Sequence, residues 1–455
     1  MTRSRHAWIV FLATRCVALV ADTIILAAAY LASFLLRFDF QAPHWGWRAV
    51  AMSFVTVALV QLSALILTGC YAHAWRQMKV TELPRYFAAA AMAVAVLTLM
   101  RFAIGDVAYA HVRPPYTITL MTAMFATMGF IAVRLAWRLY WFARQKESEL
   151  LEREEFSFDN TVAARFFSGK TVMVTGAGGS IGSELVRQVA GAGAAAIVMV
   201  ERGENALYEI DRELDGMAPG SLKRHALLMD FADPVKMSAA LAKFKPQVVL
   251  HAAAYKHVPM VERNPEAGWE NNAEATGKFA AIAKAAGVGR FVMISTDKAV
   301  NPVSVMGKTK LAAEKAIMAL NEEGKTSFAA VRFGNVMGSS GSVVPLFREQ
   351  IAKGGPLTVT HPDMKRYFMT LREAVNLVLQ AASRSERAIY TLDMGSPVRI
   401  VDLAEGMIRQ AGLRPYVDVP IVFTGIRPGE KLFEELDISD KSCYKTDMAK
   451  IYITK

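Results

Sequence analysis

Residues 172–182 read Val-Met-Val-Thr-Gly-Ala-Gly-Gly-Ser-Ile-Gly, and this stretch decides the fold of the region around it. Strand-forming residues lead into a turn with glycine at positions 176, 179 and 182, and a helix-forming run follows. A strand, a glycine turn and a helix in this order are typical of a dinucleotide-binding βαβ unit. Small residues let the backbone approach a pyrophosphate, whose charge the helix N-terminus stabilises. We predict a dinucleotide site at Gly176, Gly179, Ser180, Ile181 and Gly182.

The next runs of the chain supply polar groups for the same ligand. The second predicted strand ends at Glu201, about twenty residues past the last glycine, where a carboxylate can bind ribose hydroxyls. Arg202 beside it suits a 2′-phosphate, so both NAD and NADP stay open as the cofactor. Asp230 fits an adenine contact, and Ala252 and Ala253 are assigned to the same cofactor site.

Short β-rich runs alternate with helical stretches from residue 169 onward. We predict strands at 171–175, 196–200, 248–251 and 290–295. This alternation predicts an α/β fold with a Rossmann-type doubly wound parallel sheet, followed by a small C-terminal substrate-binding part. We assign residues 169–455 to this domain and the charged stretch 145–168 to a juxtamembrane linker.

The first 144 residues differ from the rest because they concentrate the apolar residues of a chain that is 53% hydrophobic. Four stretches, 16–36, 49–69, 86–104 and 116–135, have the roughly 20 residues needed to cross a bilayer. The first is too long for a signal peptide. Asp22 falls inside it and is expected to pair within the bundle, whereas Arg101 lies near the end of the third stretch and is expected to snorkel.

Basic residues predict the orientation of these helices. They gather before the first stretch, between the second and third, and after the fourth, at Arg3, Arg5, Arg76, Lys79, Arg85, Arg138, Arg144 and Lys146. Arg37 and Arg48 in the first loop weaken the contrast, yet the balance places both ends inside. We therefore expect a multi-pass membrane protein with a cytoplasmic C-terminal domain.

The remaining composition excludes other classes. The formal charge of +11 has no nucleic-acid-binding motif beside it and fits a membrane surface and anionic small substrates. Three scattered cysteines, Cys16, Cys70 and Cys443, indicate neither a disulfide framework nor a metal site.

A second stretch, Ser295-Thr296-Asp297-Lys298, ends the fourth predicted strand and is followed by Met306 and Lys310. Many short-chain dehydrogenases place a Tyr and a Lys four residues apart, with the Tyr as acid/base. Here Lys310 stands in the Lys position, but Met306 can neither donate nor accept a useful proton. Either the activity is lost or the proton chemistry has moved, and the adjacent Thr296, Asp297 and Lys298 favour the second interpretation.

Residues 169–455 resemble the bacterial nucleotide-sugar 4,6-dehydratases of surface-polysaccharide synthesis, an extended short-chain dehydrogenase group. The resemblance rests on ordered motifs at 175–182, 251–259, 295–302, 332–336, 366–370 and 427–432. The four apolar stretches resemble the membrane-bound branch, which usually takes UDP-N-acetylglucosamine and tends to carry Met where soluble relatives have Tyr. Membrane members commonly have an extra nucleotide-binding-like domain after the spans, and only about thirty residues stand there in this chain.

The resemblance implies a reaction that oxidises sugar carbon 4, expels water from carbons 5 and 6, and returns the hydride to carbon 6. Thr296 would relay the proton of the 4-hydroxyl, and Lys310 would hold the nicotinamide ribose. Asp297, if protonated, would be the acid for the departing 6-hydroxyl. Lys298, if neutral, would be the base at carbon 5.

The other motifs imply substrate binding, at Lys256, His257, Asn335, Arg366, Arg427 and Glu430, with Tyr255 in the pocket wall and Asn272 supporting the backbone. The resemblance also makes a homodimer plausible. A UDP-sugar 4-epimerase or reductase and a non-catalytic nicotinamide-binding membrane scaffold remain alternatives. A membrane glycosyl-phosphate transferase would not need the glycine turn. The identity of the UDP-sugar and the stereochemistry at carbon 5 stay open.

Overall fold

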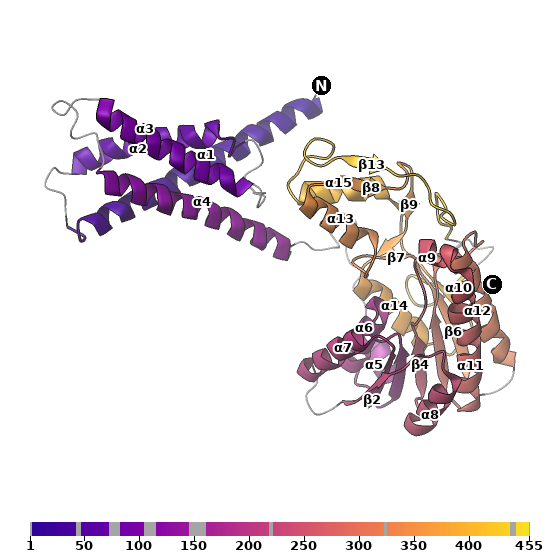
Figure 1. Cartoon of the computed structure of the whole chain (residues 1–455). Coiled ribbons are helices and arrows are strands. Elements are labelled where there is room, and N and C mark those ends of the chain that lie inside the picture. Colours follow the sequence, from indigo (N-terminus) through magenta and orange to yellow (C-terminus); the bar gives the residue numbers. More distant parts are fainter. Residues whose placement is uncertain are drawn as a thin grey trace. The chain divides into compact units, whose positions relative to one another are not determined.

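The computed structural model describes residues 2–41, 47–71, 82–103, 115–144, 161–217, 222–322, 325–436 and 443–454. The chain divides into two compact units (Figure 1). One comprises Met1–Gln145 with Ile408–Arg414, and the other comprises Lys146–Met407 with Pro415–Lys455. We call them the helical unit and the sheet unit.

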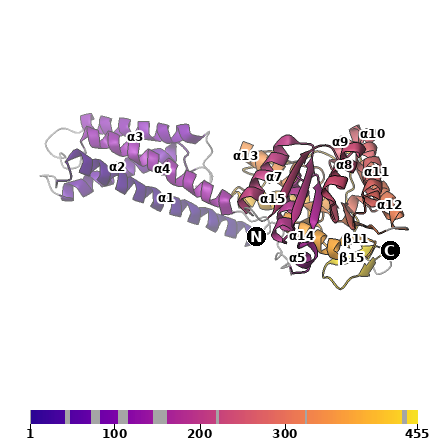
Figure 2. The same ribbon diagram turned by 90° about the horizontal axis from the view of Figure 1, so that it is seen from below.

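Four apolar helices form the helical unit, as predicted. They are α1 (Thr2–Arg37), α2 (Trp47–Leu67), α3 (Leu83–Ala103) and α4 (Tyr116–Arg144). Each contains a stretch of 20 to 22 consecutive residues that is long and apolar enough to cross a membrane. The four helices lie side by side in both views (Figures 1 and 2). Arg101 occupies the last turn of α3 and is exposed.

A buried ion pair joins the first and last of these helices. Arg134 Nη1 and Nη2 donate to the two carboxylate oxygens of Asp22 at 2.9 and 2.7 Å. Tyr71 Oη donates to the same carboxylate at 2.5 Å, and the Arg134 guanidinium lies over the Tyr86 ring. Asp22 is therefore paired within the bundle, as the sequence predicted, and its partner Arg134 was not anticipated.

The sheet unit contains a nine-stranded sheet in the order β14-β15-β11-β6-β5-β4-β1-β2-β3. Its strands are β1 (Thr171–Thr175), β2 (Ala196–Glu201), β3 (Lys223–Leu228), β4 (Val248–His251), β5 (Arg290–Ile294), β6 (Ser327–Arg332), β11 (Ile389–Leu392), β14 (Cys443–Lys445) and β15 (Ile451–Thr454). The strands from β3 to β11 pair in parallel, and β15 and β14 add an antiparallel edge. The four predicted strands are confirmed, and the chain order reverses between β1 and β4.

Helices cover both faces of this sheet (Figures 1 and 2). One layer contains α5 (Thr161–Phe167), α6 (Ser180–Gly191), α7 (Glu204–Met217) and α14 (Leu371–Ser383), and it packs on Val172 and Val174 of β1. The other contains α8 (Pro234–Phe244), α11 (Ala275–Ala285) and α12 (Val305–Ala319), and it packs on Met173. Alternate residues of one buried strand thus serve two cores, which confirms the doubly wound fold.

The predicted linker does not behave as one segment. Residues 145–160 lie outside the described residues. Residues 161–167 form α5, whose Phe167 is fully buried in the same core as β1. Packed structure therefore begins at least eight residues before the predicted boundary at 169, because α5 buries one apolar face on the sheet unit.

Small elements follow the main sheet in the chain. They include β7 (Asn335–Val336) with β10 (Phe368–Met369), β8 (Leu357–Val359) with β13 (Ile421–Phe423), and β9 (Lys365–Arg366) with β12 (Val398–Arg399). Helices α13 (Val343–Lys353) and α15 (Ile400–Gln410) complete this part. These pairs connect segments that are far apart in the sequence, so they bring distant motifs to one place.

Candidate active site

The glycine turn lies at the carboxyl end of β1, at the switch point where ligands bind in such sheets. Gly176 has φ +67°, and a Cβ there would approach the backbone N of Ala253 to 2.8 Å. A Cβ on Gly182 would lie 1.8 Å from the Gly176 carbonyl oxygen. The turn therefore closes against Ala253, and α6 begins directly after it at Ser180. These residues fit a pyrophosphate, because backbone N–H groups at a helix N-terminus face a surface without side chains.

Glu201 ends β2 beside this turn. One of its oxygens accepts from Gly178 N at 3.1 Å, and the other accepts from Arg202 N and Gly203 N, both at 2.9 Å. These bonds fix the carboxylate at the position predicted for ribose recognition. A carboxylate has about four lone-pair positions, so it can still accept from hydroxyl groups.

Arg202 and Asp230 face one another at the next strand ends. Arg202 Nη1 lies 3.6 Å from Asp230 Oδ2 and donates to Tyr255 Oη at 3.0 Å. Its guanidinium also lies over the Tyr255 ring. The structure thus brings the predicted cofactor residues together, and it pairs the charge of Arg202 with a carboxylate.

The Thr296-Asp297-Lys298 stretch forms a tight turn at the end of β5. The side chain of Thr296 caps a 3₁₀ turn, Asp297–Ala299, and donates to Asp297 Oδ1 at 2.9 Å. Lys298 Nζ donates to the same Oδ1 at 2.9 Å and to Asn335 Oδ1 at 3.1 Å. The three predicted catalytic side chains are therefore linked to one another, and Asn335 belongs to the same cluster.

Asp297 is buried more deeply than its neighbours. The residue is 3% exposed, and among the described residues no donor lies within hydrogen-bond reach of its Oδ2. That oxygen faces Gly334, where an added Cβ would approach it to 3.1 Å. Burying an unpartnered carboxylate oxygen costs free energy, and the packing around the turn must offset that cost.

Helix α12 presents Met306, Lys310 and Glu314 at intervals of one turn. Lys310 Nζ donates to the Ile294 carbonyl at 2.6 Å, and burial lowers the pKa of this amine to about 8, against the opposing effect of Glu314. Met306 packs with Val258 and Val261 in an apolar cluster. A thioether has no exchangeable proton, and this apolar packing is consistent with a Met that takes no part in proton transfer.

Two buried polar groups behind the turn were not anticipated as site residues. Glu314 binds Arg332 at 2.5 Å and accepts from Ser295 Oγ at 2.5 Å. The His251 ring lies between the hydroxyls of Thr175 (2.7 Å) and Thr276 (3.0 Å), and burial lowers its pKa to about 3. The neutral imidazole of His251 therefore links the end of β4 to Thr175 and Thr276. In the sequence, the only sign of this role is that His251 follows the apolar run 248–250.

Lys256 and His257, predicted to bind substrate, contact a serine- and glycine-rich loop at 338–342. Lys256 Nζ donates to the Ser340 carbonyl at 2.8 Å, and the His257 ring packs on Gly341. Burial lowers the pKa of both side chains. Ser340 N donates to Ser180 Oγ at 3.0 Å, so this loop also reaches the cofactor turn. Asn272 holds the Tyr255 backbone at both its N–H and its carbonyl, as expected.

Arg366, Arg427 and Glu430 were also predicted to bind substrate. The Arg366 guanidinium is buried and donates to the carbonyls of Lys365, Lys431 and Leu432 at 2.7, 2.7 and 3.2 Å. Arg427 is half exposed and pairs with Glu430 at 2.9 Å. Arg366 thus holds the chain segment that follows Arg427 and Glu430, and ligand contact by these three residues stays a prediction.

Glu434 is a site residue that sequence reasoning missed. It is 9% exposed, and its Oε1 lies 3.8 Å from Arg366 Nε. Burial raises the pKa of its carboxyl group, an effect that Lys298 opposes and Asp297 reinforces. The sequence does not indicate that Glu434 is buried, because two adjacent glutamates, Glu434 and Glu435, are typical of a solvent-exposed segment.

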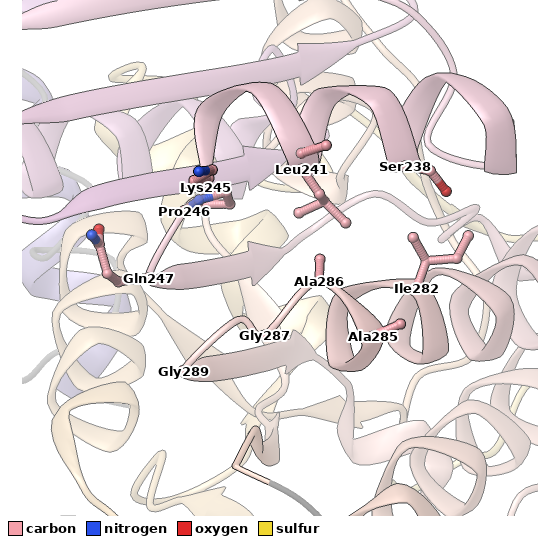
Figure 3. A pocket seen from close by; sticks show the side chains of 11 residues that line it. Ser238, Leu241, Lys245, Pro246, Gln247, Ile282, Ala285, Ala286, Gly287 and Gly289 are labelled. Atoms are coloured by element: carbon pink, nitrogen blue, oxygen red, sulfur yellow. The ribbon is translucent and has the colours of Figure 1, made fainter.

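A hollow of about 610 Å³ lies elsewhere, between α8 and α11 (Figure 3). Leu241 and Ile282 face it from the two helices, and Gln247 and Gly289 border it. The latter two residues directly precede β4 and β5, so this hollow is at the amino edge of the sheet. It is not part of the site, whose residues follow the carboxyl ends of the strands.

A glycine turn at the switch point of a doubly wound sheet, with a buried Lys on the helix after β5, defines a protein of the short-chain dehydrogenase/reductase type. Within this class, a family model described as "Polysaccharide biosynthesis protein" matches residues 172–455. The chain belongs to that family.

Known proteins support this assignment. The probable polysaccharide biosynthesis protein EpsC of Bacillus subtilis is 48% identical over 311 residues, which cover 68% of this chain and 52% of that relative. The match therefore spans about half of that relative's length. A Campylobacter jejuni protein named UDP-N-acetylglucosamine 4,6-dehydratase (inverting) is 32% identical over 61% of this chain and 80% of its own. The solved structure of Pen from Bacillus thuringiensis has 30% identity and a TM-score of 0.58, and covers 64% of this chain and 90% of its own.

Proposed function

We propose that the protein is a nucleotide-sugar 4,6-dehydratase that converts UDP-N-acetylglucosamine into the UDP-4-keto-6-deoxy sugar for surface glycan synthesis. The observation that best supports this proposal is the Thr296-Asp297-Lys298 cluster, which joins a hydroxyl, a buried carboxyl and an amine at the end of β5. The relative named as a UDP-N-acetylglucosamine 4,6-dehydratase supports the same reaction. An epimerase needs no acid and base for carbons 5 and 6, so this cluster favours dehydration over epimerisation.

NAD or NADP would lie on the glycine turn, with its ribose hydroxyls near Glu201 and Lys310. When bound, the nicotinamide supplies hydride acceptance at carbon 4 and hydride donation at carbon 6. Lys310 is already held by the Ile294 carbonyl, so its amine stays beside the end of β5. Gly176 and Ala253 leave room for the pyrophosphate because neither places a large side chain there.

The hydrogen bonds of the cluster give a balanced route for both protons. Thr296 accepts the proton of the 4-hydroxyl and passes its own proton along its 2.9 Å bond to Asp297. Asp297 then protonates the departing 6-hydroxyl, which leaves as water. Lys298 takes the carbon-5 proton during elimination and returns it to carbon 5 when carbon 6 is reduced. Asp297 and Lys298 both end the cycle in their starting states.

The experiment is to incubate the purified full-length protein with UDP-N-acetylglucosamine and to identify products by NMR and mass spectrometry. We expect a 4-keto-6-deoxy sugar, with loss of one water in mass. Conversion to the 4-epimer without mass change would indicate the epimerase instead. If the protein retains its dinucleotide but forms neither product, the result would support the non-catalytic scaffold. Denaturing the protein releases the bound nucleotide, which can then be identified as NAD or NADP.

We further propose that α1–α4 span the bacterial inner membrane and that the sheet unit is cytoplasmic. The apolar lengths of the four helices and the basic residues at their predicted inner ends support this orientation. A fluorescent protein fused to the C-terminus should then be fluorescent, whereas alkaline phosphatase fused there should be inactive. An active phosphatase would reverse the orientation.

A further inference from the structure

The loop at residues 338–342 connects two parts of the site that are far apart in the chain. It follows β7 and leads into α13. Ser340 uses both of its backbone groups: its N–H donates to Ser180 Oγ at 3.0 Å, and its carbonyl accepts from Lys256 Nζ at 2.8 Å. The loop is therefore fastened on one side to the glycine turn and on the other to the segment that follows β4.

A glycine in this loop allows its close approach to the segment after β4. Gly341 has φ +70°, a backbone conformation that residues with a Cβ rarely adopt. A Cβ there would also lie 2.6 Å from Cε1 of His257, the neighbour of Lys256. Both the backbone conformation and the contact with His257 require a glycine, so the loop packs directly on this segment.

Ser180 is the residue at which the loop meets the predicted pyrophosphate site. It is the first residue of α6, whose first backbone N–H groups have no partner within the helix. Gly176 and Gly182 keep side chains away from this position, since a Cβ on either would collide with the backbone. A dinucleotide on the glycine turn would therefore have its diphosphate beside Ser180, where the loop is attached.

We propose that the 338–342 loop is a strap that retains the dinucleotide, and that Lys256 is a positioning residue that holds the strap closed through Ser340. The inference rests on the proposed function, because a reaction that returns its hydride to the sugar needs no exchange of nicotinamide between turnovers. In this role Lys256 acts on the Ser340 carbonyl and not on the sugar. Release of the dinucleotide then requires the loop to leave Ser180.

The rate of dinucleotide release tests this proposal without any sugar present. The purified full-length protein is given NADH or NADPH, according to which nucleotide denaturation releases, and is then mixed with an excess of the oxidised form. The change in nicotinamide fluorescence gives the release rate. Lys256→Met removes the ammonium group and keeps an unbranched side chain, so release should be about 3–10-fold faster, the effect of one lost hydrogen bond. Lys353→Met, at the exposed end of α13, is the matched control and should release at the wild-type rate.

Gly341→Ala tests the strap through its backbone. Ala at this position has to leave the φ +70° conformation or press on His257, so the loop should move and release should be about tenfold faster or more. Gly287→Ala is the matched control, because Gly287 has φ +74° with nothing within 4 Å of an added Cβ and lies just after α11. Equal release rates in these two variants would contradict the strap. If Gly341→Ala does not fold, the exposed Lys256→Met decides.

Hydrogen exchange distinguishes a strap from a direct contact between Lys256 and the dinucleotide. If the loop retains the dinucleotide, the bound dinucleotide stabilises the closed loop in return, because coupling between two binding events is reciprocal. Amide exchange in the 338–342 peptide, followed by mass spectrometry, should therefore slow when NADH or NADPH is added and should be faster in Lys256→Met. Unchanged exchange in both cases would overturn the proposal, and faster release in Lys256→Met would then indicate a direct contact.

The outcomes separate this inference from the proposed function. If no dehydrated sugar forms but Lys256→Met releases its dinucleotide faster than Lys353→Met, the proposed reaction fails and the strap stands. If the dehydrated sugar forms and all release rates coincide, the strap is overturned and the reaction stands.

Discussion

Lys298 and Lys310 lie near one another in the fold but have different partners. Lys298 donates to a carboxylate and an amide oxygen, and Lys310 donates to a backbone carbonyl. Asp297, the carboxylate partner of Lys298, belongs to the proposed proton route, whereas the carbonyl partner of Lys310 is part of the sheet. We therefore assign proton transfer to Lys298 and a holding role to Lys310.

Replacing Lys298 by Ala should lower kcat by about 10²–10⁴-fold, because the base at carbon 5 is removed. Met306→Leu in the following helix should change kcat by less than about twofold, since Met306 packs in an apolar cluster with Val258 and Val261 and volume-conserving exchanges are tolerated. Initial rates of 4-keto sugar formation measure both. If Lys298→Ala forms the 4-keto sugar at the wild-type rate, Lys298 is not the base of the reaction.

Gly334→Ala should disturb the Thr296-Asp297-Lys298 cluster without replacing any of its three side chains. Its Cβ would lie 2.7 Å from Met394 Sδ, 3.0 Å from the Tyr367 carbonyl and 3.1 Å from Asp297 Oδ2. Overpacking of this kind costs about 1–3 kcal/mol, so we expect a lower melting temperature and at least about a tenfold lower kcat.

The control is Gly191→Ala at the end of α6, where nothing lies within 4 Å of an added Cβ. It should leave both the melting temperature and kcat nearly unchanged. If Gly334→Ala and Gly191→Ala have the same melting temperature and kcat, the close contacts expected for a Cβ at Gly334 do not limit stability or activity.

The sequence predicted the residues of the catalytic cluster better than their arrangement. Thr296, Asp297 and Lys298 are adjacent in the chain, so their proximity needed no tertiary information. Glu434 could not be found in this way, because its approach depends on β9 and on Arg366 holding a distant segment. The orientation of Asp297 Oδ2 toward Gly334 depends on tertiary packing for the same reason.

At the scale of elements, His251 links β4 to the pH dependence of stability. Its pKa is about 3 in the folded protein and about 6.5 when unfolded, so the unfolded state binds the additional proton between these values. Stability is therefore lost as pH falls below 6.5, by about 2 kcal/mol at pH 5.

His251→Gln removes this titration and should flatten the loss between pH 7 and pH 5. Thermal unfolding of the full-length protein in detergent, followed at several pH values, provides the measurement. Parallel curves for the variant and the wild-type protein would show that other groups cause the acid sensitivity.

Element prediction succeeded where hydrophobic runs were continuous. β1, β2, β4 and β5 are buried on both faces and follow such runs, and all four were predicted. Strands β3, β6 and β11 were not predicted, although β6 is also buried. The antiparallel edge formed by β14 and β15 was missed too, because short strands at an edge alternate polar and apolar residues only weakly. Helix α5 was assigned to a linker because charged residues dominate the preceding stretch 146–155, and its own two buried residues, Ala163 and Phe167, form only a short apolar face.

At the scale of the whole chain, the described part of the helical unit contains a buried ion pair between Asp22 and Arg134. Asp22→Asn should destabilise the unit by about 3–5 kcal/mol, because the buried charge of Arg134 would lose the carboxylate that pairs with it. The double variant Asp22→Leu/Arg134→Leu should recover much of this loss, since apolar pairs often replace buried ion pairs at little cost.

Unfolding of the purified protein by increasing SDS fraction, followed by circular dichroism, can rank the three proteins. The order should be wild type, then the double variant, then Asp22→Asn. A double variant that is less stable than Asp22→Asn would contradict the cost assigned to removing the carboxylate beside Arg134.

The same ion pair has a consequence for biosynthesis. Asp22 is made 112 residues before Arg134, so at about 5–20 residues per second the ribosome needs roughly 6–20 s to supply the partner. During that interval the carboxylate of the first helix lacks the arginine that pairs with it in the folded bundle. A chain that stops before α4 keeps this exposed defect permanently, and quality control in the membrane could recognise it. Completion of the fourth helix is thus the step at which the nascent bundle becomes able to close.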